Sequence, residues 1–331
     1  MKKYKVLVTD GAAAQKKFFE IEKEALPKIG AELIFSQCNT EDEVIEAAKG
    51  VDVILNVQAP VTKKVINTLD NCKVIVRYGV GVDTVDIGSA TEKGIPVVNV
   101  PNFCIEEVST IAIALLLACA RKLIPFNNSI KKGFWDKSIG REVHSLKGKV
   151  FGLVGFGNIA KATARKAKAF NLDIVAYDPY LNKNEGQKYG VKLIDFDILL
   201  KNSDFISVHV PLTEETKYLF GKKEFNMMKK SAFFINTARG KVVNEKALCE
   251  ALKEGQIMGA GLDVMEKEPV ESDNPLLKVD NIILTPHVAS FTEEAFTQLH
   301  VSVTQEVMRV LSGKLPLSLV NPQVKEKLTL N

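Results

Sequence analysis

Three charged residues each follow an apolar run that has the length of a buried strand: Arg239, Glu268 and His287. The guanidinium can clamp a carboxylate and polarise a carbonyl group. The imidazole can donate a proton, and the carboxylate can orient the imidazole and keep it protonated. Together these groups suit the reduction of a 2-keto acid, although three unrelated surface charges would give the same pattern.

A glycine-rich turn, Gly155-Phe156-Gly157-Asn158-Ile159-Ala160, separates an apolar run from a helix-like stretch. Gly155 permits a tight turn, Gly157 lets the backbone approach a pyrophosphate, and the helix N-terminus attracts negative charge. Asp178 ends the next apolar run, twenty-one residues past Gly157, where it can accept hydrogen bonds from ribose hydroxyls and repel a 2′-phosphate. The layout predicts dinucleotide binding and favours NAD over NADP; a purely structural turn is the alternative.

The remaining histidines and the cysteines are weaker candidates. His144 lies in a polar stretch, and His300 lies within a helical pattern where a packing role is expected. His209 ends a strand-like run and either lines the cofactor site or packs. We expect Cys104 to be a buried thiol.

Strand-like and helical patterns alternate along most of the chain, which indicates parallel sheets with helices on both faces. One series ends near residue 100 and a second begins at Lys149. Between them, Ile105 to Lys122 predicts one long buried helix, and Asn127 to Lys147 predicts a polar loop. A last helix is expected from Thr292 to Ser312.

The position of the glycine turn near residue 150 means that another unit precedes the cofactor unit. We therefore predict an α/β fold of two doubly wound parallel-sheet domains, with a Rossmann NAD domain inserted into a flavodoxin-like substrate domain. The last helix is expected to cross back, which places residues 1–100 and 290–331 in the discontinuous substrate domain and 101–289 in the NAD domain.

Composition excludes several other classes of protein. The 331 residues carry a net charge of +4 without a concentrated basic block, so nucleic acid is not an expected partner. The longest apolar run, Ile111 to Ala120, is too short to span a bilayer, and no signal peptide is recognised. Five widely spaced cysteines suggest reduced thiols in a cytoplasmic protein, and no metal site is expected.

Over essentially its full length the chain resembles the D-isomer-specific 2-hydroxyacid dehydrogenases, with the closest similarity to the phosphoglycerate dehydrogenase-like and C-terminal-binding-protein-like branch. The similar segments occur in the family's order, and they are Arg77 to Asp83, Val98 to Asn102, Gly152 to Ala160, Ala176 to Pro179, His209 to Thr213, Asn236 to Gly240, Asp263 to Pro269 and Thr285 to His287.

The resemblance assigns roles to individual residues. It implies that Arg239, Glu268 and His287 are catalytic, and that the backbone N–H groups of Val80 and Gly81 bind the substrate carboxylate, with Arg239 as a further substrate contact. It implies a homodimer formed through the inserted domain. The residues that it places around NAD are Gly155, Gly157, Asn158, Ile159, Asp178, Val210, Thr216, Thr237, Ala238 and Asp263.

Departures from the family pattern narrow the expectations. Ala160 replaces the last glycine of the fingerprint and is expected to alter packing without abolishing cofactor binding. No arginine occurs from Asn56 to Thr62, which argues against a phosphorylated substrate. Hydroxypyruvate, glyoxylate, pyruvate or a branched 2-keto acid is expected instead. An NADH-sensing, corepressor-like protein with little turnover is the alternative, whereas Glu268 argues against formate oxidation.

Overall fold

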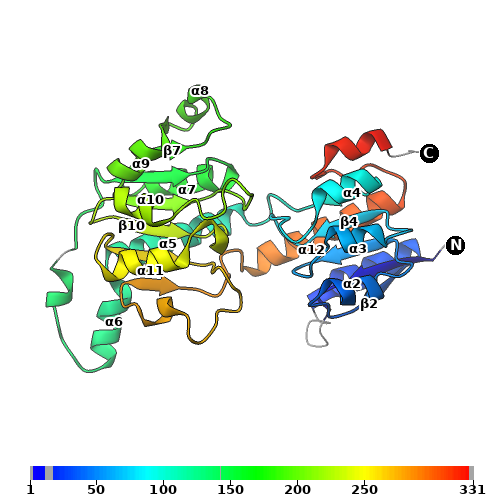
Figure 1. Ribbon diagram of the computed structural model, residues 1–331, viewed down its shortest axis with the longest axis horizontal. Coiled ribbons are helices and arrows are strands. Elements are labelled where there is room, and N and C mark those ends of the chain that lie inside the picture. Colours follow the sequence, from blue (N-terminus) through cyan, green and yellow to red (C-terminus); the bar gives the residue numbers. More distant parts are fainter. Residues whose placement is uncertain (1–2, 12–17, 142, 328–331) are drawn as a thin grey trace. The chain divides into compact units, whose positions relative to one another are not determined.

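The computed structural model describes residues 3–11, 18–141 and 143–327, and the chain divides into two compact units. The first unit combines Met1–Phe103 with Thr292–Asn331, and the second is Cys104–Phe291. From the sequence, the boundaries between the two domains were expected after residues 100 and 289, within three residues of those in the structure. The chain leaves the first unit, forms the second and returns, so both ends of the sequence belong to one unit (Figure 1).

The first unit is built on a parallel sheet in the order β2-β1-β3-β4-β5, the flavodoxin-like order. β3 is buried at all four positions, as an apolar run in a sheet covered on both faces should be. The strands of this sheet are β1 (Tyr4–Val8), β2 (Ala31–Phe35), β3 (Val53–Asn56), β4 (Val74–Arg77) and β5 (Val97–Val98).

Helices from both parts of the sequence cover this sheet. α12 begins after Thr292, whose hydroxyl accepts the N–H of Ala295 and caps the helix. Its buried stripe, which includes Leu299 and Val303, joins the core beside β1, β3 and β4. The helices are α1 (Glu20–Ala25), α2 (Glu41–Ala47), α3 (Lys63–Asn67), α4 (Ile87–Lys93) and α12 (Glu293–Leu311).

The second unit contains a seven-stranded parallel sheet in the order β12-β11-β10-β9-β6-β7-β8. Strand order reverses between β6 and β9, the switch point at which Rossmann folds bind ligands. The predicted fold class is therefore confirmed. The strands are β6 (Val150–Val154), β7 (Asp173–Tyr177), β8 (Lys192–Leu193), β9 (Phe205–Val208), β10 (Phe233–Asn236), β11 (Gly259–Leu262) and β12 (Ile282–Leu284).

One local prediction for this unit was wrong, and one strand was not predicted. The expected polar loop is helical at its start, because α6 (Leu123–Lys131) follows α5 (Ile105–Ala120) after a short turn. α6 has no buried residue, so its sequence carries no core-facing stripe. The edge strand β8 has only two residues and gave no recognisable pattern. The other helices are α7 (Asn158–Lys168), α8 (Lys183–Gln187), α9 (Phe196–Asn202), α10 (Lys222–Met227) and α11 (Glu245–Lys253).

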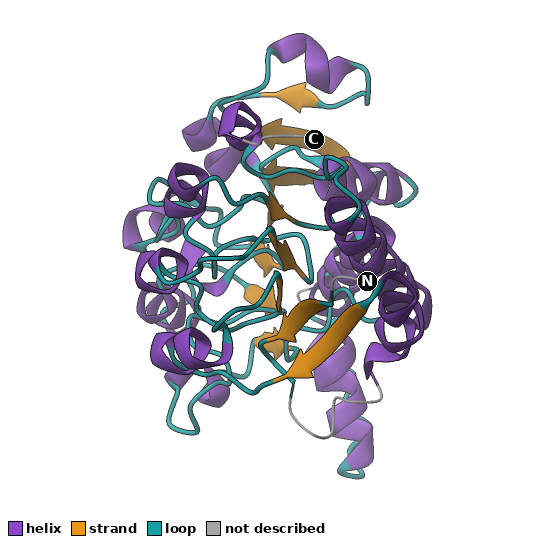
Figure 2. Ribbon diagram, turned by 90° about the vertical axis from the view of Figure 1, so that its right-hand side faces the viewer, coloured by secondary structure: helices purple, strands orange, loops and turns teal. Residues whose placement is uncertain are grey.

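Helices lie on both sides of the strands, as the alternating pattern predicted (Figure 2). Among the described residues, no single helix is long and apolar enough to cross a membrane. α5 and α6 taken together meet the length and composition, but the chain bends by 62° between them.

Candidate active site

The glycine turn lies at the switch point of the second sheet. Gly155 has φ +88°, and a Cβ there would lie 2.9 Å from the carbonyl carbon and oxygen of His209 at the end of β9. Glycine is therefore required by both conformation and space. Gly157 is the N-cap of α7, and a Cβ there would meet no atom within 4 Å. The start of α7 is thus open to close approach by an anionic ligand.

Asp178, which follows β7, is hydrogen-bonded to this turn. Its Oδ2 accepts the N–H of Phe156 at 2.9 Å, and its Oδ1 accepts the N–H of Tyr180 at 3.0 Å. The N–H of Gly155 donates to the carbonyl of Tyr177 at 2.8 Å. A carboxylate has about four lone-pair positions, so two remain for ribose hydroxyls.

Arg239 stands on a turn that the buried Asn236 organises. The side-chain oxygen of Asn236 accepts the N–H of Ala238, and its amide nitrogen donates to the carbonyl of Arg239, both at 2.9 Å. A Cβ at Gly240 would lie 1.9 Å from the carbonyl oxygen of Met265. The turn after β10 therefore packs directly on the loop after β11, and Asn236 acts as a positioning residue that sequence reasoning did not assign.

His287 and Glu268 form a hydrogen-bonded pair, with 2.7 Å between Nδ1 and Oε2. Oε1 of Glu268 accepts the N–H of Met265 at 2.9 Å. Burial raises the pKa of Glu268, but the bonds from His287 and Met265 and the charges of His287 and Arg239 outweigh burial and leave the pKa below its usual value. Because Glu268 occupies Nδ1, Nε2 is the ring nitrogen left for a reacting atom.

Asp263 holds the segment that carries His287. The buried carboxylate accepts the hydroxyl of Thr285 at 2.6 Å and the N–H groups of Val288 and Ala289 at 3.0 and 2.8 Å. The carbonyl of Asp263 also accepts the N–H of His287 at 2.8 Å. The structure therefore gives Asp263 a positioning role beside the cofactor contact expected for it, and Thr285 shares that role.

The other predicted cofactor residues surround the same strand ends. Val210 lies next to Gly155, and the hydroxyl of Thr216 donates to the carbonyl of Pro211 at 2.6 Å. The buried hydroxyl of Thr237 has no hydrogen-bond partner among the described residues. Asn158 and Ile159 form the first turn of α7, and Ala238 follows β10. An unsatisfied hydroxyl and an open helix N-terminus fit a dinucleotide.

In the first unit, Val80 and Gly81 lie on the loop after β4. The loop's carbonyls are occupied, since Gly79 accepts the N–H of Val100 at 2.9 Å and Val80 accepts the side-chain amide of Asn99 at 2.6 Å. The N–H groups of Val80 and Gly81 donate to no acceptor in the part of the chain that the structure describes. Two neighbouring free N–H groups are suited to binding a carboxylate.

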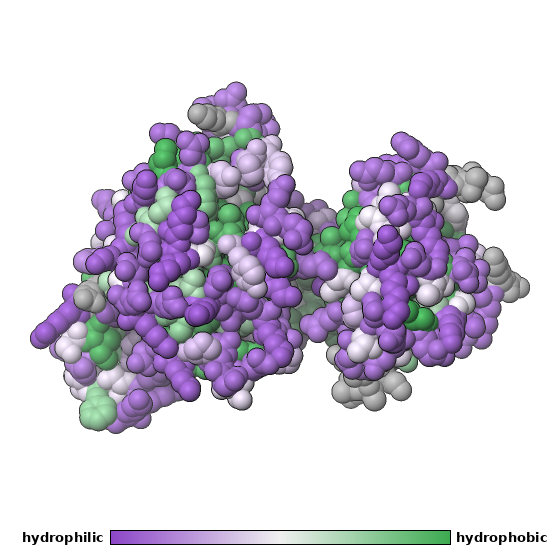
Figure 3. All heavy atoms as spheres, viewed as in Figure 1, coloured by the Kyte–Doolittle hydropathy of each residue, from purple (hydrophilic) through white to green (hydrophobic). Residues whose placement is uncertain are grey.

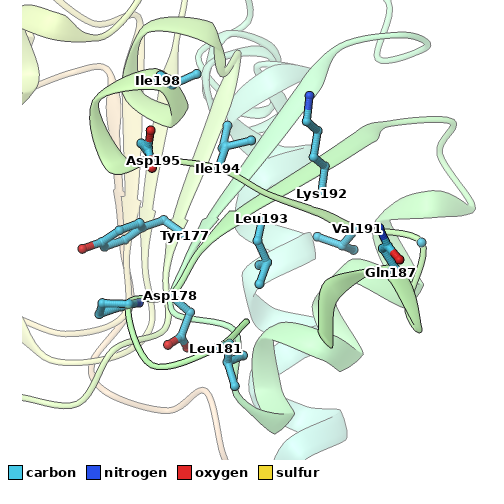
Figure 4. Close-up of a pocket in the computed structure, with 12 residues that line it drawn as sticks. Tyr177, Asp178, Leu181, Gln187, Val191, Lys192, Leu193, Ile194, Asp195 and Ile198 are labelled. Carbon is cyan, nitrogen blue, oxygen red and sulfur yellow. The ribbon is translucent and has the colours of Figure 1, made fainter. Parts of the chain in front are cut away.

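A cavity of about 870 Å³ lies on the β8 side of Asp178 (Figure 4). Its walls are largely apolar, and Asp178 is the only predicted site residue among them. We therefore assign no catalytic role to it. Over the described ranges, no three His, Cys, Asp or Glu side chains are grouped as a metal site would require. The cavity is lined by Tyr177, Asp178, Pro179, Leu181, Gln187, Gly190, Val191, Lys192, Leu193, Ile194, Asp195 and Ile198.

Known proteins share both the sequence and the fold of this chain. The family model described as "D-isomer specific 2-hydroxyacid dehydrogenase, NAD binding domain" matches residues 113–289. The glyoxylate reductase of Thermococcus litoralis is 38% identical over 334 residues, which cover 97% of this chain and 98% of that protein.

Two further comparisons agree. The D-3-phosphoglycerate dehydrogenase of Methanocaldococcus jannaschii is 43% identical over 284 residues, covering 85% of this chain but only 54% of that protein. The chain thus spans about half the length of this relative. The crystal structure of a glyoxylate reductase from Paecilomyes thermophila superposes with a TM-score of 0.87 at 28% identity, covering 98% of this chain and 100% of that one. The chain therefore belongs to the D-isomer-specific 2-hydroxyacid dehydrogenase family, and its second unit is an NAD-binding domain of that family.

Proposed function

We propose that this protein is an NAD-dependent oxidoreductase that interconverts a small 2-keto acid and the corresponding D-2-hydroxy acid. The observation that carries the proposal is the His287–Glu268 hydrogen bond of 2.7 Å, which lies at the same edge of the sheet as Arg239. An imidazole paired with a carboxylate beside a guanidinium is suited to carbonyl reduction.

Each group has a defined role in the proposed reaction. The reduced nicotinamide, when bound, supplies the hydride that goes to the keto carbon. Nε2 of His287 donates the proton that goes to the carbonyl oxygen, and Glu268 stabilises the imidazolium before that transfer. Arg239 polarises the carbonyl and, with the N–H groups of Val80 and Gly81, holds the substrate carboxylate. In the oxidative direction His287 accepts the hydroxyl proton.

The loop after β3 supports an unphosphorylated substrate. The carboxylate of Asp10 accepts the N–H groups of Val57 and Gln58, both at 2.9 Å. Asp10 is buried, and it receives a further hydrogen bond from the hydroxyl of Thr9 at 2.7 Å. N–H groups that could hold a phosphate are therefore engaged by a negative charge, which would repel a phosphate. We propose glyoxylate or hydroxypyruvate as the substrate.

Turnover of a panel of 2-keto acids, followed by NADH absorbance, tests this proposal. The panel comprises glyoxylate, hydroxypyruvate, pyruvate, a branched 2-keto acid and phosphohydroxypyruvate, each with NADH and with NADPH. We expect turnover of glyoxylate or hydroxypyruvate with NADH and little turnover of phosphohydroxypyruvate. Absence of turnover with the whole panel would refute the enzyme proposal, and NADH binding without turnover would instead favour a sensor.

We also propose that two chains associate through the second unit. α6 and the segment after it expose large apolar side chains, and hydrophobic residues reach the surface in the region of α6 (Figure 3). Trp135 is 80% exposed. Apolar groups gathered on one surface usually mark a contact with another protein. The exposed apolar residues of this surface, which we call the α6 patch, are Leu123, Ile124, Ile130, Phe134 and Trp135.

A further inference from the structure

A buried polar cluster in the first unit takes no part in the chemistry proposed above. It consists of Glu22 in α1, Tyr78 after β4 and His300 in α12, none of them more than 5% exposed. The hydroxyl of Tyr78 donates to Oε1 of Glu22 at 2.7 Å. Nδ1 of His300 lies 2.7 Å from the same oxygen. One carboxylate oxygen therefore joins three segments that are far apart in the sequence.

The surroundings of the cluster are apolar. The ring of His300 meets that of Phe18 edge-on at 4.4 Å between centroids, and Phe19 lies 5.7 Å away. The second oxygen of Glu22 and Nε2 of His300 have no hydrogen-bond partner among the described residues. A buried carboxylate is costly unless it is paired, so the two contacts at Oε1 hold Glu22 in a single arrangement.

Tyr78 remains a hydrogen-bond donor in this environment. Burial is the main cause that raises its pKa well above the usual value, and the charge and hydrogen bond of Glu22 add to it. The hydroxyl therefore stays protonated and remains the donor in its hydrogen bond to Glu22.

The same tyrosine directly precedes the loop with the free N–H groups. The N–H of Tyr78 donates to the carbonyl of Asn56 at 2.8 Å, and Gly79 turns the chain with φ +140°. We propose that Glu22, held by His300, anchors the side chain of Tyr78 and thereby positions the N–H groups of Val80 and Gly81 for the substrate carboxylate. Glu22 is then a positioning residue, and this inference rests on the substrate-binding role proposed for the loop.

Matched variants separate positioning from general stability. Tyr78→Phe keeps the ring and removes the donor, His300→Leu removes the second contact, and His300→Asn restores a donor near the place of Nδ1. Val44→Ala is the control, because this buried side chain belongs to a separate core cluster of the same unit. Loss of one such hydrogen bond is expected to change binding by about 3- to 10-fold.

We expect Tyr78→Phe and His300→Leu to raise KM for the 2-keto acid about 3- to 10-fold, with kcat changed less than about two-fold. The Kd for NADH should be unchanged, because the cofactor binds the second unit. His300→Asn should bring KM most of the way back to the wild-type value. Val44→Ala should leave KM near the wild-type value. An unchanged KM in both cluster variants would overturn the link to substrate binding.

Amide hydrogen exchange tests the anchor without relying on turnover. Exchange in the peptide that contains Tyr78 to Gly81 should be faster in Tyr78→Phe and His300→Leu than in Val44→Ala. Equal exchange in these three variants would overturn the positioning role. If the wild type turned over no 2-keto acid, the proposed function would fall, and the exchange experiment would still decide whether Glu22 and His300 hold this loop.

Discussion

At the scale of single residues, the charge of Glu268 determines how His287 can act. The carboxylate lies 2.7 Å from Nδ1 and has a pKa below its usual value. It is therefore ionised throughout the neutral range, and its support for a protonated ring is lost only as pH falls through that lowered pKa. The pair is suited to a proton donor that works near neutral pH.

Glu268→Gln should slow the reduction of the 2-keto acid. Without the negative charge the carboxylate's support for the protonated imidazole is lost, so kcat/KM for reduction should fall about ten-fold or more. Glu271→Gln is the matched control, because Glu271 is an exposed carboxylate paired with Lys267. An unchanged kcat/KM in Glu268→Gln would contradict the assigned role.

His209 should make the stability of the fold depend on pH. Burial lowers the pKa of His209 to about 4, against a usual value of 6.5. As pH falls between these values the unfolded chain takes up a proton that the folded chain does not, so stability decreases. His209→Gln should remove roughly 2 kcal/mol of this loss between about pH 7 and about pH 5.

Urea unfolding at several pH values measures this effect. His144→Gln is the control, because His144 is an exposed histidine. If the free energy of unfolding changed with pH equally in the wild type and in His209→Gln, His209 would not be held neutral by burial.

The sequence was informative about residues that act at strand ends and uninformative about residues that act through distant partners. Arg239, Glu268 and His287 follow apolar runs, so their common edge could be inferred from parallel strands alone. Glu22 and His300 are 278 positions apart, and nothing local indicates that they meet. His300 had been expected to pack within its helix, and the structure adds the carboxylate that it contacts.

At the scale of elements, the turns between strands and helices constrain the site more tightly than the strands do. Gly240 lies against the carbonyl of Met265, whereas Gly157 faces open space. The two glycines look alike in the sequence, because each occurs in a strand-to-turn motif. Their different surroundings predict opposite effects of the same substitution.

Gly240→Ala should destabilise the fold by about 1–3 kcal/mol and lower kcat, because the added methyl group would overlap backbone and displace Arg239. Gly157→Ala should change stability by less than about 0.5 kcal/mol. It should raise the Kd for NADH about ten-fold or more, because its methyl group would occupy the approach to a pyrophosphate. Thermal unfolding and NADH titration distinguish the two variants. NADH binding as tight in Gly157→Ala as in the wild type would contradict the proposed approach of the pyrophosphate to Gly157.

Element boundaries were predictable where helices bury a stripe and unpredictable where they do not. The last helix was expected from Thr292 to Ser312 and runs as α12 from Glu293 to Leu311. By contrast, α6 has no buried residue, and its second half was expected to be loop. A helix without a buried residue packs only lightly within its own chain, which is what a helix at a contact between two chains would show.

At the scale of the whole molecule, the α6 patch predicts self-association. Trp135 is the only tryptophan, so its fluorescence reports on this surface alone. Emission should shift to shorter wavelength at concentrations where light scattering gives a dimer mass, and should return on dilution. Phe134→Glu should favour the monomer, whereas Leu317→Glu, an exposed leucine of the first unit, should not. A concentration-independent monomer would rule out association through the α6 patch.

The discontinuous first unit also sets an order of events during protein synthesis. When the ribosome has added Phe291, the second unit is complete, but the sheet of the first unit still lacks α12. Val98 and Leu319 have not yet paired, and Glu22 is without His300. The first third of the protein is therefore made first and becomes native last, and its apolar sheet must be protected while nearly two hundred further residues are translated.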